Sequence, residues 1–389
     1  MAYRARLKEF DDVLSQDVIN LKTLKTISFY GIPDDHGLRS LCWRLLLNYL
    51  PVERISWSSF LVEKRNLYKQ LIDEMVVMPG SKESNGDVTC EDHPLSMNPD
   101  SQWQTFFKDN EVLLQIDKDV RRLCPDISFF QQPTDFPCTK IVDNKEDVRL
   151  HIRVQRSVLK SANVERKGLG ITKIALMTKK ANEDYAPMDA GKEAHWEVVE
   201  RILFLYAKLN PGQSYVQGMN EIVGPIYHAF ACDPDISFRE HAEADCFFCF
   251  TNLMSEIRDF FIKSLDETDH GINKIMNTML SQLKLYDLDV WLKLQQLDLK
   301  PQYYSFRWIT LLLSQEFPLP DVLRIWDSLF SDEKRFEFLI NVCCAMIIIL
   351  RDRLLQGDFP SNIKLLQSFP PMDVQIILSK AMELSKIKH

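Results

Sequence analysis

Two segments of the chain place charged or amide side chains where they could act on a bound partner. In residues 111–130, Asp119 and Arg122 are three positions apart, so on a helix they share a face and can form an ion pair. An arginine held in this way is a planar, permanently charged fork for anionic oxygens. In residues 209–227, the amide Gln217 lies among apolar neighbours directly before Gly218, after an Asn-Pro-Gly turn.

Each segment also has an ordinary explanation when it is taken alone. Arg122 lies near the C-terminus of a predicted helix, where a cation is favoured and an arginine is usually a solvated or ion-paired surface residue. Gln217 precedes the start of another predicted helix, where a polar side chain can cap backbone groups. Neither segment by itself therefore predicts a function.

Other motifs of catalysis and ligand binding are missing from the sequence. There is no G-x-x-x-x-G-K-[S/T] phosphate loop, no H-E-x-x-H and no G-x-S-x-G, and Gly168-x-Gly170 lacks the third glycine of a dinucleotide fingerprint. Cys246 and Cys249 have the spacing of half a zinc site but no second pair, which favours packing in the core. We expect no metal and no cofactor of the protein's own.

Composition limits the class of protein further. Only 12 of 389 residues are glycine, about half the usual share or less, which disfavours tight hairpins and glycine-rich loops. The formal charge of −8 gives no general basic field for nucleic acid. The longest apolar run has nine residues, 342–350, too short for a transmembrane segment, and the N-terminus has no signal-peptide pattern. We expect a cytoplasmic protein.

Hydrophobic spacing predicts helices along most of the chain and no strand, so the expected fold class is all-α. Two segments, 79–100 and 131–144, have the polar and proline-rich character of loops. The expected helical segments are 1–30, 38–50, 52–78, 111–124, 190–206, 242–265, 271–297, 302–315, 319–330, 334–356 and 371–387.

The segment 145–180 differs from the rest in charge, with ten basic residues against three acidic ones, hence 10 − 3 = +7. One hypothesis is peripheral contact with an anionic membrane or an acidic partner surface. The alternative is an ordinary solvated loop and helix face.

Taken together, the segments resemble the TBC domain family, the GTPase-activating proteins of Rab small GTPases. The similarity lies in four ordered signatures over about 300 residues, which together are far more specific than any one alone. They are I-x-x-D-x-x-R at Ile116, Asp119 and Arg122; Y-x-Q at Tyr215 and Gln217 before Gly218; G-I-P with R-x-x-x-W at Gly31, Ile32, Pro33, Arg39 and Trp43; and R-I-W-D at Arg324, Trp326 and Asp327.

This resemblance implies a role for each motif. Arg122 would be an arginine finger oriented by Asp119, and Gln217 a glutamine finger, both supplied in trans to a GTP-loaded Rab in order to accelerate hydrolysis and regulate vesicle traffic. GTP and Mg²⁺ would belong to the partner. Tyr215, Gly218 and Met219 would hold the loop that contains Gln217 and would contact the partner. Ile116, Arg39 and Trp43 would be structural residues of the motifs.

The expected organisation is one large TBC domain at 31–350, a helical lead-in at 1–30 and a helical extension at 351–389. Insertions at about 79–100 and 131–190 are longer than the family's minimal pattern, and Leu123 replaces a threonine that is common after the arginine. Two alternatives remain open: a non-catalytic Rab-binding scaffold and a purely helical adaptor.

Overall fold

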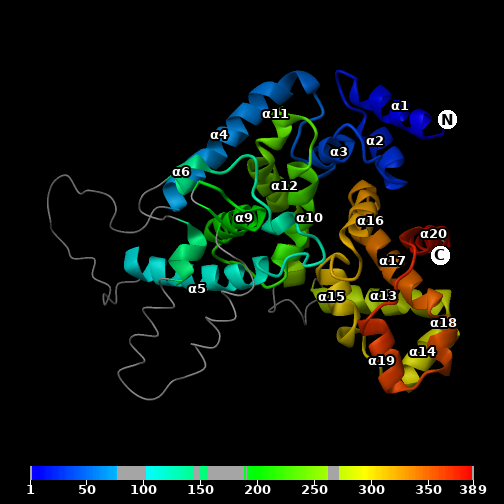
Figure 1. The fold of residues 1–389 in the computed structure, drawn as a ribbon. Helices are drawn as coiled ribbons and strands as arrows, with labels where there is room; N and C mark the ends of the chain where they lie inside the picture. Colours follow the sequence, from blue (N-terminus) through cyan, green and yellow to red (C-terminus); the bar gives the residue numbers. More distant parts are fainter. Residues whose placement is uncertain are drawn as a thin grey trace, which may run out of the picture. The chain divides into compact units, whose positions relative to one another are not determined.

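The computed structural model describes residues 2–76, 102–143, 149–155, 188–189, 191–261 and 271–387. Within these residues the regular elements are helices, and β-structure is limited to two isolated bridges, Val18–Glu53 and Pro133–Ala194 (Figure 1). The expectation of an all-α fold is confirmed. No helix among the described residues is both long and apolar enough to cross a membrane.

The described residues form two compact units. The first unit comprises Met1–Leu61, His228–Arg239 and Phe248–His389, and the second comprises Val62–Tyr227 and Glu240–Phe247. Both motifs that the resemblance assigns to chemistry fall in the second unit. The two signatures expected to be structural fall in the first.

The first unit is built mainly from the helices at the two ends of the chain. Within it α17 packs along α20, and α16 packs on α2 and α3. Its helices are α1 (Ala2–Leu14), α2 (Leu21–Phe29), α3 (Leu38–Leu46), α11 (Ile236–Arg239), α13 (Ile272–Tyr286), α14 (Leu288–Gln296), α15 (Ser305–Thr310), α16 (Leu319–Ser331), α17 (Arg335–Ile349), α18 (Arg351–Gln356), α19 (Phe359–Gln367) and α20 (Val374–Ser385), with 3₁₀ turns at Arg54–Ser56, Arg258–Phe261 and Pro301–Tyr303.

Several expected helices are interrupted, and the interruptions have local causes. The segment 271–297 forms two helices because the Asp287 side chain accepts a hydrogen bond from the Val290 amide at 3.1 Å and so begins α14. Likewise the lead-in is two helices, and the second begins where Asn20 accepts from the Thr23 amide. The helix α19, which begins at an Asp358 cap, lies in the expected helical extension 351–389, between the two helical segments expected there.

In the first unit, the G-I-P/R-x-x-x-W and R-I-W-D signatures meet at one buried carboxylate, although Ile32 and Asp327 are 295 residues apart in the sequence. Asp327 is fully buried and accepts from Trp43 Nε1 at 2.9 Å, from the Ile32 amide at 2.9 Å and from Arg39 Nε at 3.2 Å. Trp43 also packs against Trp326. These contacts place Arg39 and Trp43 in the packing of the first unit, and their role as fold residues stays a prediction.

The second unit is organised around α9, which α5 crosses and packs against (Figure 1). Leu113, Ile116, Val120 and Leu123 are all 0 % exposed, so the expected apolar stripe, with the motif residue Ile116, does face the core. The elements of this unit are most of α4 (Trp57–Met75), α5 (Gln102–Val120), a 3₁₀ turn (Phe129–Gln131), α6 (Thr139–Val142), α9 (His195–Leu209), the first part of α10 (Met219–Ala231) through Tyr227, and the start of α12 (Ala242–Ile257).

Candidate functional site

The segment with Asp119 and Arg122 differs from the expected helix 111–124 at both ends. The helix α5 begins at Gln102 and ends at Val120, five residues before Pro125, and beyond it Cys124 adopts a positive φ of 43° that lies outside the helical region. Tight i→i−3 bonds close the end: the Arg122 amide donates to the Asp119 carbonyl at 3.1 Å and the Leu123 amide to Val120 at 3.2 Å. Arg122 therefore lies in a turn just beyond the helix.

Arg122 is exposed and still held in place. Its Nη2 donates to Asp119 Oδ1 at 2.7 Å and its Nε donates to the Lys118 carbonyl at 3.1 Å. The arginine side chain is 66 % exposed, whereas the aspartate side chain is 9 % exposed. The Nε and Nη2 atoms thus fix the direction of the guanidinium, and its Nη1 edge faces solvent or a partner.

The loop with Gln217 is braced at its beginning. Tyr206 in α9 donates its hydroxyl to Gln213 Oε1 at 2.8 Å, and the Asn210 side-chain amide donates to the Tyr206 carbonyl. The Ser214 amide closes a turn on the Asn210 carbonyl at 2.7 Å, with Ser214 at a positive φ of 58°. The expected Asn-Pro-Gly turn is present at this point.

At its end the same loop is fixed by buried residues. Gly218 has a φ of 103°, a conformation that favours glycine. Met219 is 0 % exposed, and its sulfur accepts from the Val216 amide at 3.4 Å. Gly218, Met219 and Tyr215 are all buried, so in this structure they hold the loop and offer little surface to a partner.

Gln217 is the exposed residue between these buried ones. Its side chain makes no hydrogen bond with the residues the structure describes, so the alternative of a helix-capping glutamine does not apply here. A free primary amide can both donate and accept.

Asp119 joins the two segments. Its Oδ2 accepts from the Tyr215 hydroxyl at 2.7 Å, while its Oδ1 accepts from Arg122. Burial, together with the neighbouring Asp119 charge, holds the pKa of Tyr215 well above its ordinary value, so the phenol remains a donor. One carboxylate therefore orients the arginine and fixes the tyrosine of the Y-x-Q motif, which lies 96 residues further along the chain.

A buried ionic cluster behind this site was not anticipated. Asp117 accepts from Arg121 Nε at 2.9 Å, and the Arg121 guanidinium lies 4.8 Å from the centre of the Trp196 ring in α9. Burial raises the pKa values of Asp117 and of Glu200, and the proximity of the two carboxyl groups raises that of Glu200 further. The i, i+4 spacing of Asp117 and Arg121 was a signal for the ion pair, but nothing in the sequence indicated that it would be buried.

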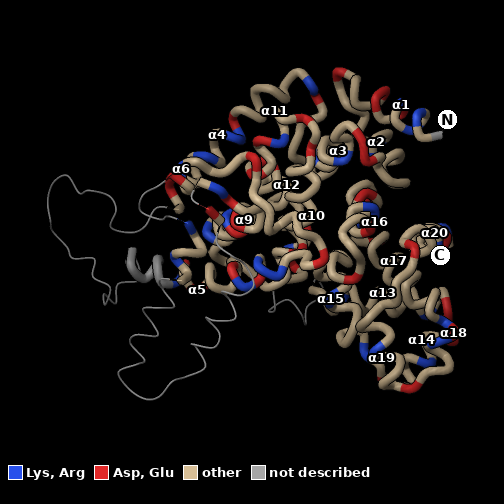
Figure 2. Tube along the Cα trace, viewed as in Figure 1, with Lys and Arg blue, Asp and Glu red and all other residues tan. Residues whose placement is uncertain are grey.

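Two of the ten basic residues in 145–180 also lie in this unit. Arg149 Nη1 is 3.4 Å from both Glu197 oxygens, and Arg153, 4 % exposed, donates to Asn110 Oδ1 at 2.6 Å. These two are occupied by protein partners, so a membrane contact would depend on the other eight, which fall outside the described residues. Over the described helices, basic and acidic residues are interspersed (Figure 2).

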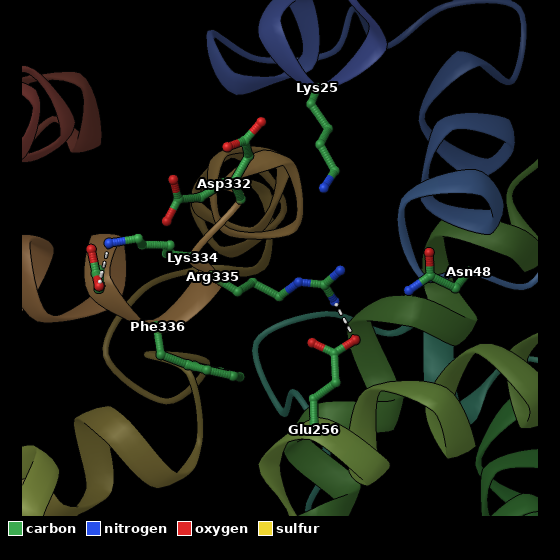
Figure 3. Close-up of a pocket in the computed structure, with 9 residues that line it drawn as sticks. Lys25, Asn48, Glu256, Asp332, Lys334, Arg335 and Phe336 are labelled. Atoms are coloured by element: carbon green, nitrogen blue, oxygen red, sulfur yellow. Dashed lines mark hydrogen bonds and ion pairs between the residues drawn. The ribbon is translucent and has the colours of Figure 1, made fainter. Parts of the chain in front are cut away.

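The first unit holds a hollow of about 500 Å³ lined by charged residues of α2, α12 and the start of α17 (Figure 3). Lys25 points toward it, but Arg335 is paired with Glu256 at 3.2 Å and Lys334 with Glu337 at 3.0 Å. Two of its three cations thus have carboxylate partners, and its remaining carboxylates disfavour an anion. We assign no ligand to this hollow. Among the described residues no cluster of histidine, cysteine and acidic side chains is arranged to hold a metal ion.

Comparison with known proteins supports the sequence resemblance. The family model described as the Rab-GTPase-TBC domain matches residues 183–355. The chain is 56 % identical to the TBC1 domain family member 13 of Homo sapiens over 396 residues, which cover 99 % of each chain. It is 35 % identical to a TBC domain-containing protein of Schizosaccharomyces pombe over 458 residues, covering all of this chain and 74 % of that one.

The fold has a solved counterpart. The crystal structure of the Ypt/Rab-GAP domain of Gyp1p superposes with a TM-score of 0.68 over 99 % of both chains, at 24 % sequence identity. This likeness shows a shared fold. Together with the near full-length identity to member 13, it shows that the chain belongs to the TBC domain family.

Proposed function

We propose that this protein is a GTPase-activating protein for a Rab-family small GTPase and that Arg122 and Gln217 are its two fingers. Two similar proteins support the proposal by their names: Gyp1p, whose crystallised part is a Ypt/Rab-GAP domain, and gyp1 of Schizosaccharomyces pombe, a GTPase-activating protein 24 % identical over 398 residues. In this proposal the activity resides in a domain at 31–350.

The observation that carries the proposal is the bond between Tyr215 and Asp119. It ties the arginine turn to the glutamine loop, so two exposed side chains from distant segments are supported by one buried carboxylate. A site that serves catalysis needs groups held in place before the partner arrives, because ordering them afterwards costs activation free energy.

Arg122 would neutralise the charge that develops on the transferred phosphoryl group. Its fork geometry matches phosphate oxygens, its charge is permanent, and its Nη1 edge is unoccupied. In small GTPases an arginine supplied in trans accelerates hydrolysis by roughly 10³–10⁵.

Gln217 would orient the attacking water, because its amide can accept a hydrogen bond from the water while it donates another to a phosphate or backbone oxygen. GTP and Mg²⁺ would be bound by the partner, consistent with the lack of a phosphate loop in this sequence. In the cell the protein would act from the cytoplasm on membranes bearing its Rab. The basic residues of 145–180 could contribute a salt-sensitive contact with those membranes.

The deciding experiment is single-turnover GTP hydrolysis by a panel of Rab proteins, with wild type, Arg122→Ala, Arg122→Lys and Gln217→Ala. All three variants should lose most of the acceleration seen with wild type. Matched controls are Arg258→Ala, an arginine with a similar 62 % exposure and an adjacent carboxylate, and Gln296→Ala, another exposed glutamine. If Arg122→Ala and Arg122→Lys both equal wild type, the arginine assignment is wrong. Full activity of Gln217→Ala alone would refute only the glutamine finger, and binding without hydrolysis across the panel would favour the scaffold.

A further inference from the structure

The helix α10, which follows the glutamine loop, contacts the arginine turn at a polar point that the sequence did not suggest. Asn220 is 4 % exposed, and its Nδ2 donates to the backbone carbonyl of Asp119 at 3.3 Å. The same nitrogen donates to Glu221 Oε1 at 3.0 Å, and Asn220 Oδ1 lies 3.4 Å from the Tyr215 hydroxyl. Asp119 contributes one of the last carbonyls of α5, a position without a full complement of helical bonds.

A second contact lies one turn further along α10. The side chain of Leu123, 0 % exposed, packs so closely on Gly224 that a methyl group there would be 2.9 Å from Cδ1 and 3.1 Å from Cδ2. Carbon atoms make favourable contact at about 3.5–4.0 Å, so only a hydrogen atom fits. Any larger residue at 224 must displace Leu123, which has no exposed space to move into.

Asn220 and Gly224 are four residues apart and therefore share one face of α10. The groups that they touch, the Asp119 carbonyl and the Leu123 side chain, lie on either side of Arg122 in the sequence. Gln217 is two residues before the first residue of the same helix. One face of α10 thus contacts residues on both sides of Arg122 in the sequence, and Gln217 lies just before the start of the same helix.

We propose that Asn220 and Gly224 are positioning residues, which fix the distance and direction of Arg122 relative to Gln217 through the Asp119 carbonyl and through Leu123. This inference rests on the proposed function. It adds two residues with no reacting role of their own, and it gives a reason for glycine in the interior of α10, where glycine otherwise weakens a helix.

The test is a suppressor experiment on single-turnover hydrolysis by the Rab that wild type activates best. Gly224→Ala should lower the maximal rate about 10- to 100-fold, because a displacement of about 1 Å at a catalytic group can cost 10² in rate. The half-saturating concentration should change less than about threefold, since the exposed surface is unaltered. Leu123→Val shortens the side chain with which the new methyl group at 224 would clash. Adding it to Gly224→Ala should therefore restore the rate to within about threefold of wild type.

Two further variants make the suppression specific. Leu123→Val alone leaves a gap over Gly224 and should itself lower the maximal rate, so the double variant should be faster than either single variant. Asn220→Ala should also lower the maximal rate, and here Leu123→Val should give no rescue, because the lost group is a hydrogen bond. An unchanged maximal rate in Gly224→Ala would overturn the inference. So would an impaired Gly224→Ala that Leu123→Val does not rescue, since the cause would then be a clash with the ring of Pro225.

Hydrogen–deuterium exchange of the protein alone separates failure of this inference from failure of the proposed function. The Arg122 and Leu123 amides, which bond to Asp119 and Val120, should exchange faster in Gly224→Ala and return toward wild type in the double variant. If wild type accelerates no Rab, the proposed function fails, and the exchange data still decide whether α10 positions the turn. Exchange that is equal in wild type and Gly224→Ala would overturn the positioning role.

Discussion

Each of the two units contains an aspartate that accepts hydrogen bonds from an arginine and from an aromatic side chain. The two sites differ in how exposed the arginine is. In the second unit Asp119 accepts from Arg122 at 2.7 Å and from the Tyr215 hydroxyl at 2.7 Å. In the first, Asp327 accepts from Arg39 at 3.2 Å and from Trp43 Nε1 at 2.9 Å. Each carboxylate thus binds one arginine and one aromatic side chain, and Asp327 accepts in addition from the Ile32 amide at 2.9 Å.

Exposure separates the two arginines. Arg39 is 12 % exposed, and its guanidinium also donates to Asp34 at 2.6 Å and to the Ile32 carbonyl at 2.9 Å, so its fork is fully occupied. Arg122 is 66 % exposed and keeps one edge open. An arginine–aspartate motif therefore does not by itself indicate a finger, and the open edge is the feature that distinguishes Arg122 from Arg39 in the proposed function.

The largest expected contrast comes from removing each arginine. Arg122→Ala should reduce Rab-stimulating activity by about 10³ or more while changing the free energy of unfolding by under about 1 kcal/mol, because an exposed ion pair contributes little. Arg39→Ala should cost about 3–5 kcal/mol of unfolding free energy, because it leaves Asp327 buried without its cation. Single-turnover hydrolysis and urea denaturation measure the two effects. If Arg39→Ala lowers the hydrolysis rate but leaves the urea midpoint unchanged, Arg39 serves activity and not stability.

Glu197 is a third carboxylate that pairs with an arginine, and its raised pKa should make the stability of the protein depend on pH. Burial raises its pKa from 4.5 to about 7, with Glu193 adding and Arg149 opposing. Since the folded pKa lies above the unfolded one, the contribution of Glu197 to stability is complete below about pH 4.5 and is lost as pH rises through 7. The loss amounts to about 3 kcal/mol.

Glu197→Gln should remove that decline. Burial also lowers the pKa of His151 from 6.5 to about 3, and its contribution has the opposite sign: it is present above pH 6.5 and is lost as pH falls toward 3. In the variant, unfolding free energies from urea denaturation should therefore fall less steeply between pH 5 and pH 7.5 than in wild type, while the raised pKa values of Asp117 and Glu200 still contribute a decline. Parallel pH profiles for wild type and variant would show that Glu197 does not titrate in this range.

A smaller effect is expected at the aromatic donor of the first unit. Trp43→Phe removes the hydrogen bond to Asp327 and leaves a buried carboxylate oxygen short of one partner. The free energy of unfolding should fall by about 2 kcal/mol, with no change in the maximal hydrolysis rate of the folded protein. A rate defect that persists in fully folded Trp43→Phe would show that Trp43 affects hydrolysis as well as stability.

The smallest effect tests the shared carboxylate of the second unit. Asp119→Asn keeps the shape but loses the charge and one acceptor, so Arg122 and Tyr215 can no longer both be held as they are. The maximal rate should fall about tenfold, equivalent to about 1.4 kcal/mol, with little change in affinity for the GTP-loaded partner. Lys118→Ala, an exposed neighbour, is the control. Equal rates for Asp119→Asn and Lys118→Ala would show that Asp119 does not orient the arginine.

Much of the fold followed from local pattern. Leucine spacing and low glycine content predicted helices and no strands, because side chains at i, i+3 and i+4 share a face whatever the rest of the chain does. The errors were at ends and breaks: α5 ended at Val120 instead of near Pro125, and Asp287 divided an expected helix. Caps and positive-φ residues cause such stops, and their effect depends on contacts that sequence spacing does not contain.

The helical class, the pairing of Asp119 with Arg122 and the family resemblance of the motifs can be predicted from the sequence alone, because each depends on residue type and short-range spacing. Three relations become evident only in the folded chain: Tyr215 reaches Asp119, Arg39 is enclosed while Arg122 is open, and Asn220 and Gly224 contact the arginine turn. Those relations arise when segments far apart in the chain pack together, and burial then sets which charged groups are enclosed and which remain open to a partner.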